Sequence, residues 1–170
     1  ISYNELLHEQ SRKLDGNLNY LDAKMILNKA RGKTNRKSLP NSVVEKIEHL
    51  AEKVIIIPEL DDLLTSRLIR ILKNAARWVF QETAKDLIGL SNITNLPDQI
   101  WSGTGGNYPA RIIGLEIISR GGSAVRFDHG GSSGLTSPAG CFSLSELSVS
   151  SKFIMGTSYL AEMSESYCPN

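Results

Sequence analysis

The chain has 170 residues, of which 41% are hydrophobic and 22% charged, and its net charge is +1. This length supports one hydrophobic core or two small subdomains, and the composition excludes a wholly disordered protein. The balanced charge provides no overall positive field for nucleic acid, and no apolar run approaches the roughly 20 residues of a transmembrane helix. Because no initiator Met or signal-peptide pattern precedes Ile1, we expect a processed or excised piece of a longer protein.

The first half of the chain predicts about four amphipathic helices. A capping box at Ser2–Glu5 predicts a helix over residues 3–14, and a second helix follows over residues 18–31, where Gly32 ends it. A second capping box at Ser42 begins a helix that ends or kinks at Pro58. The longest predicted helix covers residues 59–87.

The longest helix carries a regular apolar stripe that includes Leu64, Leu68, Ile71, Ala75 and Val79. Residues three and four positions apart share one face of a helix, so we expect this stripe to be buried at the centre of a helical bundle. The basic residues between them, Arg67, Arg70, Lys73 and Arg77, are expected to face solvent.

The second half of the chain changes character, because ten of the 14 glycines fall between Gly103 and Gly140. Residues 110–118 are rich in β-branched side chains and predict a strand, and residues 124–128 predict its partner in a hairpin. Further strands are predicted at residues 141–147 and 152–160. We therefore predict an α+β fold, in which a helical subdomain, residues 1–95, precedes a Gly/Ser-rich antiparallel β subdomain, residues 96–170.

The two cysteines, Cys141 and Cys168, both lie in the β-rich half. They are compatible with a disulfide outside the cell or with two buried thiols inside it. The polar surroundings of Cys168 favour the disulfide, and Asn92-Ile93-Thr94 forms a glycosylation sequon at Asn92. Both observations point to an extracellular location or the cell surface, with the cytoplasm as the alternative.

Candidate catalytic and metal sites do not survive closer inspection. Gly130-Gly131-Ser132-Ser133-Gly134 has the form of a nucleophile elbow, but all three histidines precede it, and the histidine of that site should follow. The histidines and cysteines do not have zinc-site spacing. The basic stretch from Lys24 to Lys37 could contact phosphates, but it has no interleaved aromatic residue, which favours a solvated surface. We predict no catalytic residue, metal or cofactor.

One segment, Val125 to Ser132, resembles the metal-binding Asp-x-Gly-Gly segment of bacterial effector kinases. That resemblance implies that Asp128 holds magnesium. The match covers eight residues, and the upstream catalytic segment of that family is not found in this sequence.

A second resemblance covers most of the chain. Its order of helices followed by β segments is similar to the GAIN domain of polycystin-1-like proteins and adhesion receptors. Gly114–Ile118, Gly122–Phe127 and Gly140–Glu146 are similar to that domain's opening strand pair and cysteine-containing strand. The autoproteolysis step of the family needs a His-Leu-Ser/Thr tripeptide, whereas here Ala51 follows His49-Leu50. The resemblance implies an extracellular scaffold without cleavage chemistry.

The leading hypothesis is a non-enzymatic extracellular scaffold or interaction domain of a larger, membrane-anchored protein, whose partners are other protein domains, including domains of the same parent chain. The first alternative is an intracellular effector-type or kinase-related fragment that uses Asp128. The second is a nucleic-acid-binding piece that uses Lys24 to Lys37. A Cys141–Cys168 disulfide would favour the leading hypothesis, and two free thiols would favour the alternatives.

Overall fold

The computed structural model describes residues 21–32, 39–54, 61–103, 107–128, 146–159 and 161–162. These residues form α-helices and one small sheet, so the predicted α+β class is confirmed. The predicted helix over residues 3–14, the break at Pro58 and the glycine-rich segment around Ser132 lie outside the described residues. The chain divides into two compact units, one formed by Ala30–Asn92 and the other by residues on either side of it. The predicted division at residue 95 stays a prediction.

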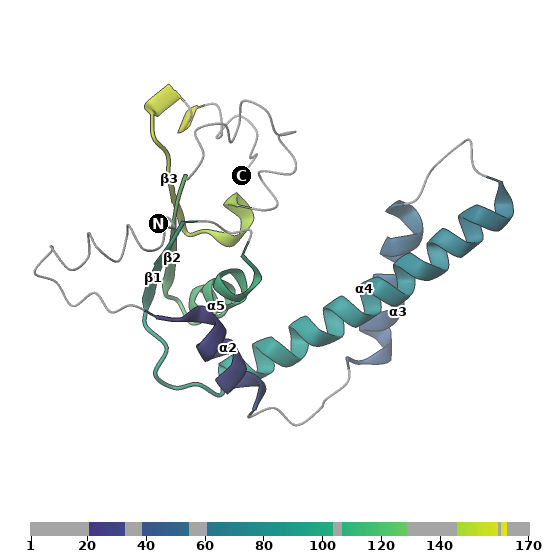
Figure 1. Cartoon of the computed structure of the whole chain (residues 1–170), viewed down its shortest axis with the longest axis horizontal. Helices are drawn as coiled ribbons and strands as arrows, with labels where there is room; N and C mark the ends of the chain where they lie inside the picture. The colour runs from purple at the N-terminus through teal and green to yellow at the C-terminus, as the bar shows by residue number, and fades with distance from the viewer. Residues whose placement is uncertain are drawn as a thin grey trace, which may run out of the picture. The chain divides into compact units, whose positions relative to one another are not determined.

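Three helices occupy the first part of the described chain: α2 (Ala23–Arg31), α3 (Asn41–Val54) and α4 (Asp62–Ser91). Side chains cap two of their N-termini, because Asp22 accepts a hydrogen bond from the Lys24 amide at 2.8 Å and Asp61 accepts one from the Leu64 amide at 2.8 Å. At the other end of α4, the Asn92 side chain donates to the Ile88 carbonyl at 2.9 Å. Figure 1 shows α3 lying along α4.

The packing of α3 on α4 reverses the orientation expected for the long helix. Ile47 and Ala51 are the buried residues of α3, and the glutamates beside them form ion pairs with Lys73 and Arg77 of α4. Lys73 and Arg77 therefore turn towards α3, whereas Arg67 and Arg70 are exposed as expected. The predicted apolar stripe lies on the side opposite α3 and is exposed. The expectation that this stripe is buried at the centre of a bundle is wrong, because α3 packs on the other side of α4, where Lys73 and Arg77 pair with its glutamates.

The sheet is parallel, which corrects the predicted antiparallel unit. Its strands are β1 (Gln99–Ser102), β2 (Ser123–Phe127) and β3 (Lys152–Ile154), in the order β1-β2-β3. In the parallel register Gln99 lies opposite Ser123, and Val125 lies opposite Lys152. Only the first part of the strand predicted at residues 152–160 forms. A 3-10 helix, η1 (Leu147–Val149), follows the end of the other predicted strand, whose residues 141–145 lie outside the described chain.

The predicted first strand of the hairpin, residues 110–118, belongs instead to a helix, α5 (Tyr108–Ser119). Pro109 stands in the first turn of this helix, where its missing N–H costs nothing. Ile112, Ile113 and Ile117 are buried, and their spacing is that of a helix face directed at the sheet. β-branched content therefore indicated a strand, but burial against β2 determines the helix. Figure 1 shows α5 beside the strands.

The turn predicted to close the hairpin ends α5. Gly121 has φ +85°, a left-handed conformation that glycine adopts without steric cost. Its amide donates to the Ile118 carbonyl and the Gly122 amide donates to the Ile117 carbonyl, both at 2.9 Å. This is a Schellman motif, which satisfies the last carbonyl groups of the helix and directs the chain into β2.

Candidate functional site

Of the site residues predicted in the β-rich half, Asp128 lies at the edge of the sheet, and the others lie outside the described residues. Asp128 directly follows β2, and its amide donates to the Ile154 carbonyl at 2.8 Å. The carboxyl end of a parallel strand is where ligands bind in α/β sheets, so Asp128 occupies a suitable place. Within the described ranges, no group of three His, Cys, Asp or Glu side chains could hold a metal ion. Cys141 and Cys168 lie outside these ranges, and their disulfide stays a prediction.

Near Asp128, the guanidinium of Arg126 is buried between β2 and α5. It donates to the Ser102 hydroxyl and, at 3.0 Å, to the Ala110 carbonyl in the first turn of α5. Burial lowers the pKa of Arg126, while the charge of Glu146 raises it. These contacts tie β1, β2 and the start of α5 together, so we assign Arg126 a structural role.

The sequon at Asn92 lies on the surface immediately after α4. Asn92 and Thr94 are exposed, whereas Ile93 between them is buried. The Asn92 backbone amide donates to the Gly89 carbonyl at 3.3 Å, so Asn92 caps the helix with both its backbone and its side chain. The candidate glycosylation residue is therefore accessible.

The predicted basic stretch is only partly described. Lys24 and Lys29 are exposed on α2, and the described residues do not include Lys33 or Lys37. Arg31, at the end of α2, donates two hydrogen bonds to the buried carboxylate of Asp86, at 2.7 and 2.8 Å. This cation therefore belongs to an internal ion pair.

We compared the chain with known proteins. No family model, curated protein or solved structure matches it. No described helix is both long enough and apolar enough to cross a membrane. The candidate site therefore rests on the described geometry alone.

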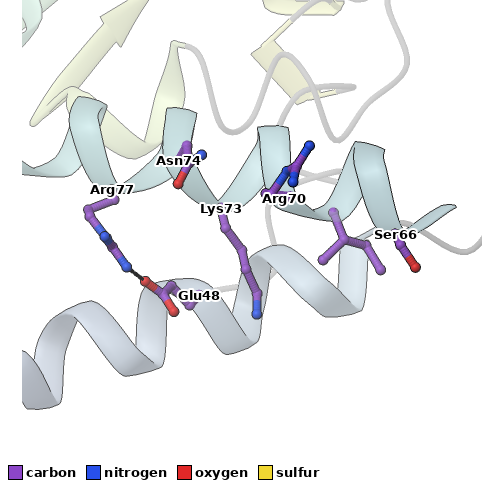
Figure 2. A pocket seen from close by; sticks show the side chains of 7 residues that line it. Glu48, Ser66, Arg70, Lys73, Asn74 and Arg77 are labelled. Carbon is purple, nitrogen blue, oxygen red and sulfur yellow. Dashed lines mark hydrogen bonds and ion pairs between the residues drawn. The ribbon is translucent and has the colours of Figure 1, made fainter. Parts of the chain in front are cut away.

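A shallow hollow of about 330 Å³ lies where α4 meets α3 (Figure 2). Most of its lining is polar and comes from α4, as in Arg70, Lys73 and Arg77, with Glu48 contributed by α3. Arg77 is bonded to Glu48, and Lys73 pairs with Glu52. Two of its cations are already paired with carboxylates of α3, so the hollow presents little uncompensated positive charge to a ligand.

The opposite side of α4 carries a row of exposed apolar residues, which we call the α4 apolar face. It consists of Leu64, Leu68, Ile71, Ala75, Trp78 and, at its rim, Val79. The large side chains expose between 37% (Leu68) and 65% (Trp78) of their surface. α4 has 30 residues and α3 has 14, so α4 is about 45 Å long and α3 about 21 Å. One short helix cannot cover all sides of α4, and a continuous exposed apolar row of this kind is typical of an interaction surface.

The sequence pattern identifies most residues of the α4 apolar face but predicts that they are buried in a core. The signal that could have corrected this lies on α3, where Glu48 and Glu52 flank the buried Ile47 and Ala51. Carboxylates that flank the apolar side of one helix favour its packing against the basic side of a neighbouring helix.

We expect the stability of the α3–α4 pair to fall in acid. The hydrogen bond and charge of Lys73 lower the pKa of Glu52 from its ordinary value of 4.5. A carboxylate with a lowered pKa in the folded state stabilises fully above the unfolded pKa, and that contribution is lost as pH falls through the folded pKa. Urea midpoints of the wild type and Glu52→Gln, measured from pH 7 to pH 3, should converge as the pH drops below about 4.5. A difference that does not change with pH would contradict this role of the Lys73–Glu52 pair.

Proposed function

We propose that the chain is a non-enzymatic interaction or scaffold domain of a larger, membrane-anchored extracellular protein, and that it binds protein through the α4 apolar face. The observation that carries this proposal is the exposure of that face. Ile71 is 62% and Trp78 is 65% exposed, and they lie one above the other on a helix stabilised by its own caps. Trp is among the residues that contribute most to protein–protein binding.

The extracellular part of the proposal is supported by the sequon. Asn92 and Thr94 are exposed after the helix end, where a glycosyltransferase could reach them. Expression through a secretory pathway should give a glycan that peptide N-glycosidase removes and that Asn92→Gln abolishes. The same secreted protein should show no free thiol if Cys141 and Cys168 are bonded. An unglycosylated protein with two free thiols would contradict the extracellular assignment.

The two alternative functions have weaker support. Asp128 occupies a favourable edge of the sheet, but no second and third metal ligand joins it among the described residues. Among the described residues of the basic stretch, Arg31 is paired with Asp86. We therefore favour protein binding over a metal-dependent or nucleic-acid function.

The protein-binding proposal requires that the α4 apolar face is open in the isolated chain. The chain has two tryptophans, so a Trp101→Phe variant reports on Trp78 alone. At submicromolar concentration, iodide should quench Trp78 almost as well as free tryptophan. The matched variant Trp78→Phe reports on Trp101, whose ring lies 5.7 Å from that of Phe127 and should be quenched less. A Trp78 shielded at this dilution would mean that the chain itself covers the face, and the proposal would fail.

A further inference from the structure

We propose that the partner of the α4 apolar face is a second copy of this chain, bound with its α4 antiparallel to the first. This inference rests on the proposed function, because it names the occupant of the same surface. A symmetric dimer needs a surface that is complementary to itself. The residues of α4 meet that requirement in spacing, size and charge.

The spacing of the face is that of a helix pair. Leu64, Leu68, Ile71, Ala75 and Trp78 follow one another at intervals of four, three, four and three residues. An average of 3.5 residues keeps side chains directed at a partner helix along its whole length. The face lies opposite the side that contacts α3, so a second α4 can approach without displacing α3.

The sizes of the side chains select the antiparallel orientation. With the two-fold axis between Ile71 and Ala75, Leu68 lies opposite Trp78 of the second copy, and Ile71 lies opposite Ala75 of the second copy. The small Ala75 then leaves room for Ile71 of the second copy, and Leu68 packs beside the Trp78 ring. A parallel arrangement in register would place Trp78 against Trp78 and Ala75 against Ala75, which creates a clash beside a void.

The charges also favour this orientation. Arg67 would lie near the neutral Gln81 of the second copy, and Asn74 would lie near Asn74 of the second copy. The two helix dipoles would run in opposite directions.

The area of the face is sufficient for a weak dimer. Its large apolar residues, Leu64, Leu68, Ile71, Trp78 and Val79, expose 37–65% of their surface. At roughly 200 Å² for a residue of this size, the exposed apolar area is about 500 Å² per copy. Stable interfaces bury about 800 Å² per partner, so polar flanking residues must supply the remainder. We expect a reversible dimer with a Kd of about 1–100 µM.

Sedimentation velocity of the full chain from about 1 to 500 µM tests the dimer. Ile71→Glu places a charge at the centre of the face and should raise the Kd at least roughly tenfold. Leu50→Glu is a matched control, because Leu50 and Ile71 are both 62% exposed, but Leu50 belongs to α3, on the other side of α4. Leu50→Glu should leave the Kd within about threefold. Both positions are exposed, so circular dichroism should show unchanged helix content.

The orientation has a separate test. In the antiparallel dimer the two copies of Asn74 are adjacent, so Asn74→Cys should form a disulfide-linked dimer under mild oxidation. In a parallel pair these positions lie on opposite flanks of the contact and should not link. The wild type, oxidised in the same way, controls for Cys141 and Cys168.

The outcomes separate this inference from the proposed function. A chain that stays monomeric to 500 µM with Trp78 open to iodide would overturn the second copy as partner and leave a different protein as the occupant. An equal loss of dimer in Ile71→Glu and Leu50→Glu would place the contact elsewhere and also overturn it. A dimer that depends on Ile71, with no Asn74→Cys link, would overturn the antiparallel arrangement.

Discussion

Gly122→Ala should destabilise the unit that contains the sheet by about 2–4 kcal/mol, because the position has no room for a methyl group. A Cβ atom at Gly122 would overlap the carbonyl oxygen of Asp98 and would lie 2.7 Å from Cγ2 of Ile117. The Asp98 carbonyl also accepts a hydrogen bond from the Ser123 amide at 2.8 Å, so it cannot move away without loosening the start of β2. The same change would disturb the Schellman motif at the end of α5.

Gly156→Ala provides the matched control. A Cβ atom at Gly156 would have no heavy atom within 4 Å, so the same chemical change should alter stability by less than about 0.5 kcal/mol. Urea unfolding of both variants, followed by the fluorescence of Trp101 in a Trp78→Phe background, measures the difference. Equal urea midpoints for the two variants would show that Gly122 lies farther from the Asp98 carbonyl than described.

The sequence was informative about helices that have clear ends and less so about the sheet. Gly32 and the capping box at Ser42 mark boundaries through local chemistry, and α2 ends and α3 begins within one residue of them. The long helix was predicted over residues 59–87 without a cap, and α4 begins and ends three to four residues later. The helix α5 could not be recognised in the same way, because its isoleucines have a strand preference that local patterning alone cannot override. Its helical state depends on burial against β2, whose partners β1 and β3 lie far away in the sequence.

Arg31→Ala should cost about 2–4 kcal/mol, more than removal of the carboxylate it binds. The Asp86 side chain is only 2% exposed, and both of its oxygens accept hydrogen bonds from Arg31, at 2.7 and 2.8 Å. Loss of Arg31 therefore deprives a buried charge of two donors. Asp86→Ala leaves Arg31 instead, and because that side chain is 50% exposed, water can solvate its guanidinium.

Lys29→Ala is the control for the same helix, since Lys29 is an exposed cation of α2 whose loss should change stability by less than about 0.5 kcal/mol. Urea midpoints of the single variants and of Arg31→Ala/Asp86→Ala complete a double-mutant cycle. The double variant should be more stable than Arg31→Ala alone. An Asp86→Ala variant less stable than Arg31→Ala would reverse the order that the burial of the two groups predicts.

The candidate site shows where single-sequence reasoning stops. Periodicity places Leu64, Leu68 and Ile71 on one face, but it cannot distinguish a face buried in the same chain from one left for a partner. That distinction depends on which side of α4 receives α3, and the Glu48–Arg77 pair marks that side. The resemblance of Val125 to Ser132 to a kinase segment implied a metal ligand at Asp128, whereas the parallel sheet supplies only a suitable edge.

The two outer strands of the sheet bear on aggregation. A strand at the edge of a sheet can template pairing with another chain, and long, flat, apolar edges are the hazardous ones. β1 and β3, which take the outer positions in the described sheet, have only four and three residues, and β3 begins with the exposed Lys152. Such short edges offer few backbone groups to an incoming strand. Folded chains are therefore expected to associate through side-chain contacts between helices rather than by adding strands to the sheet.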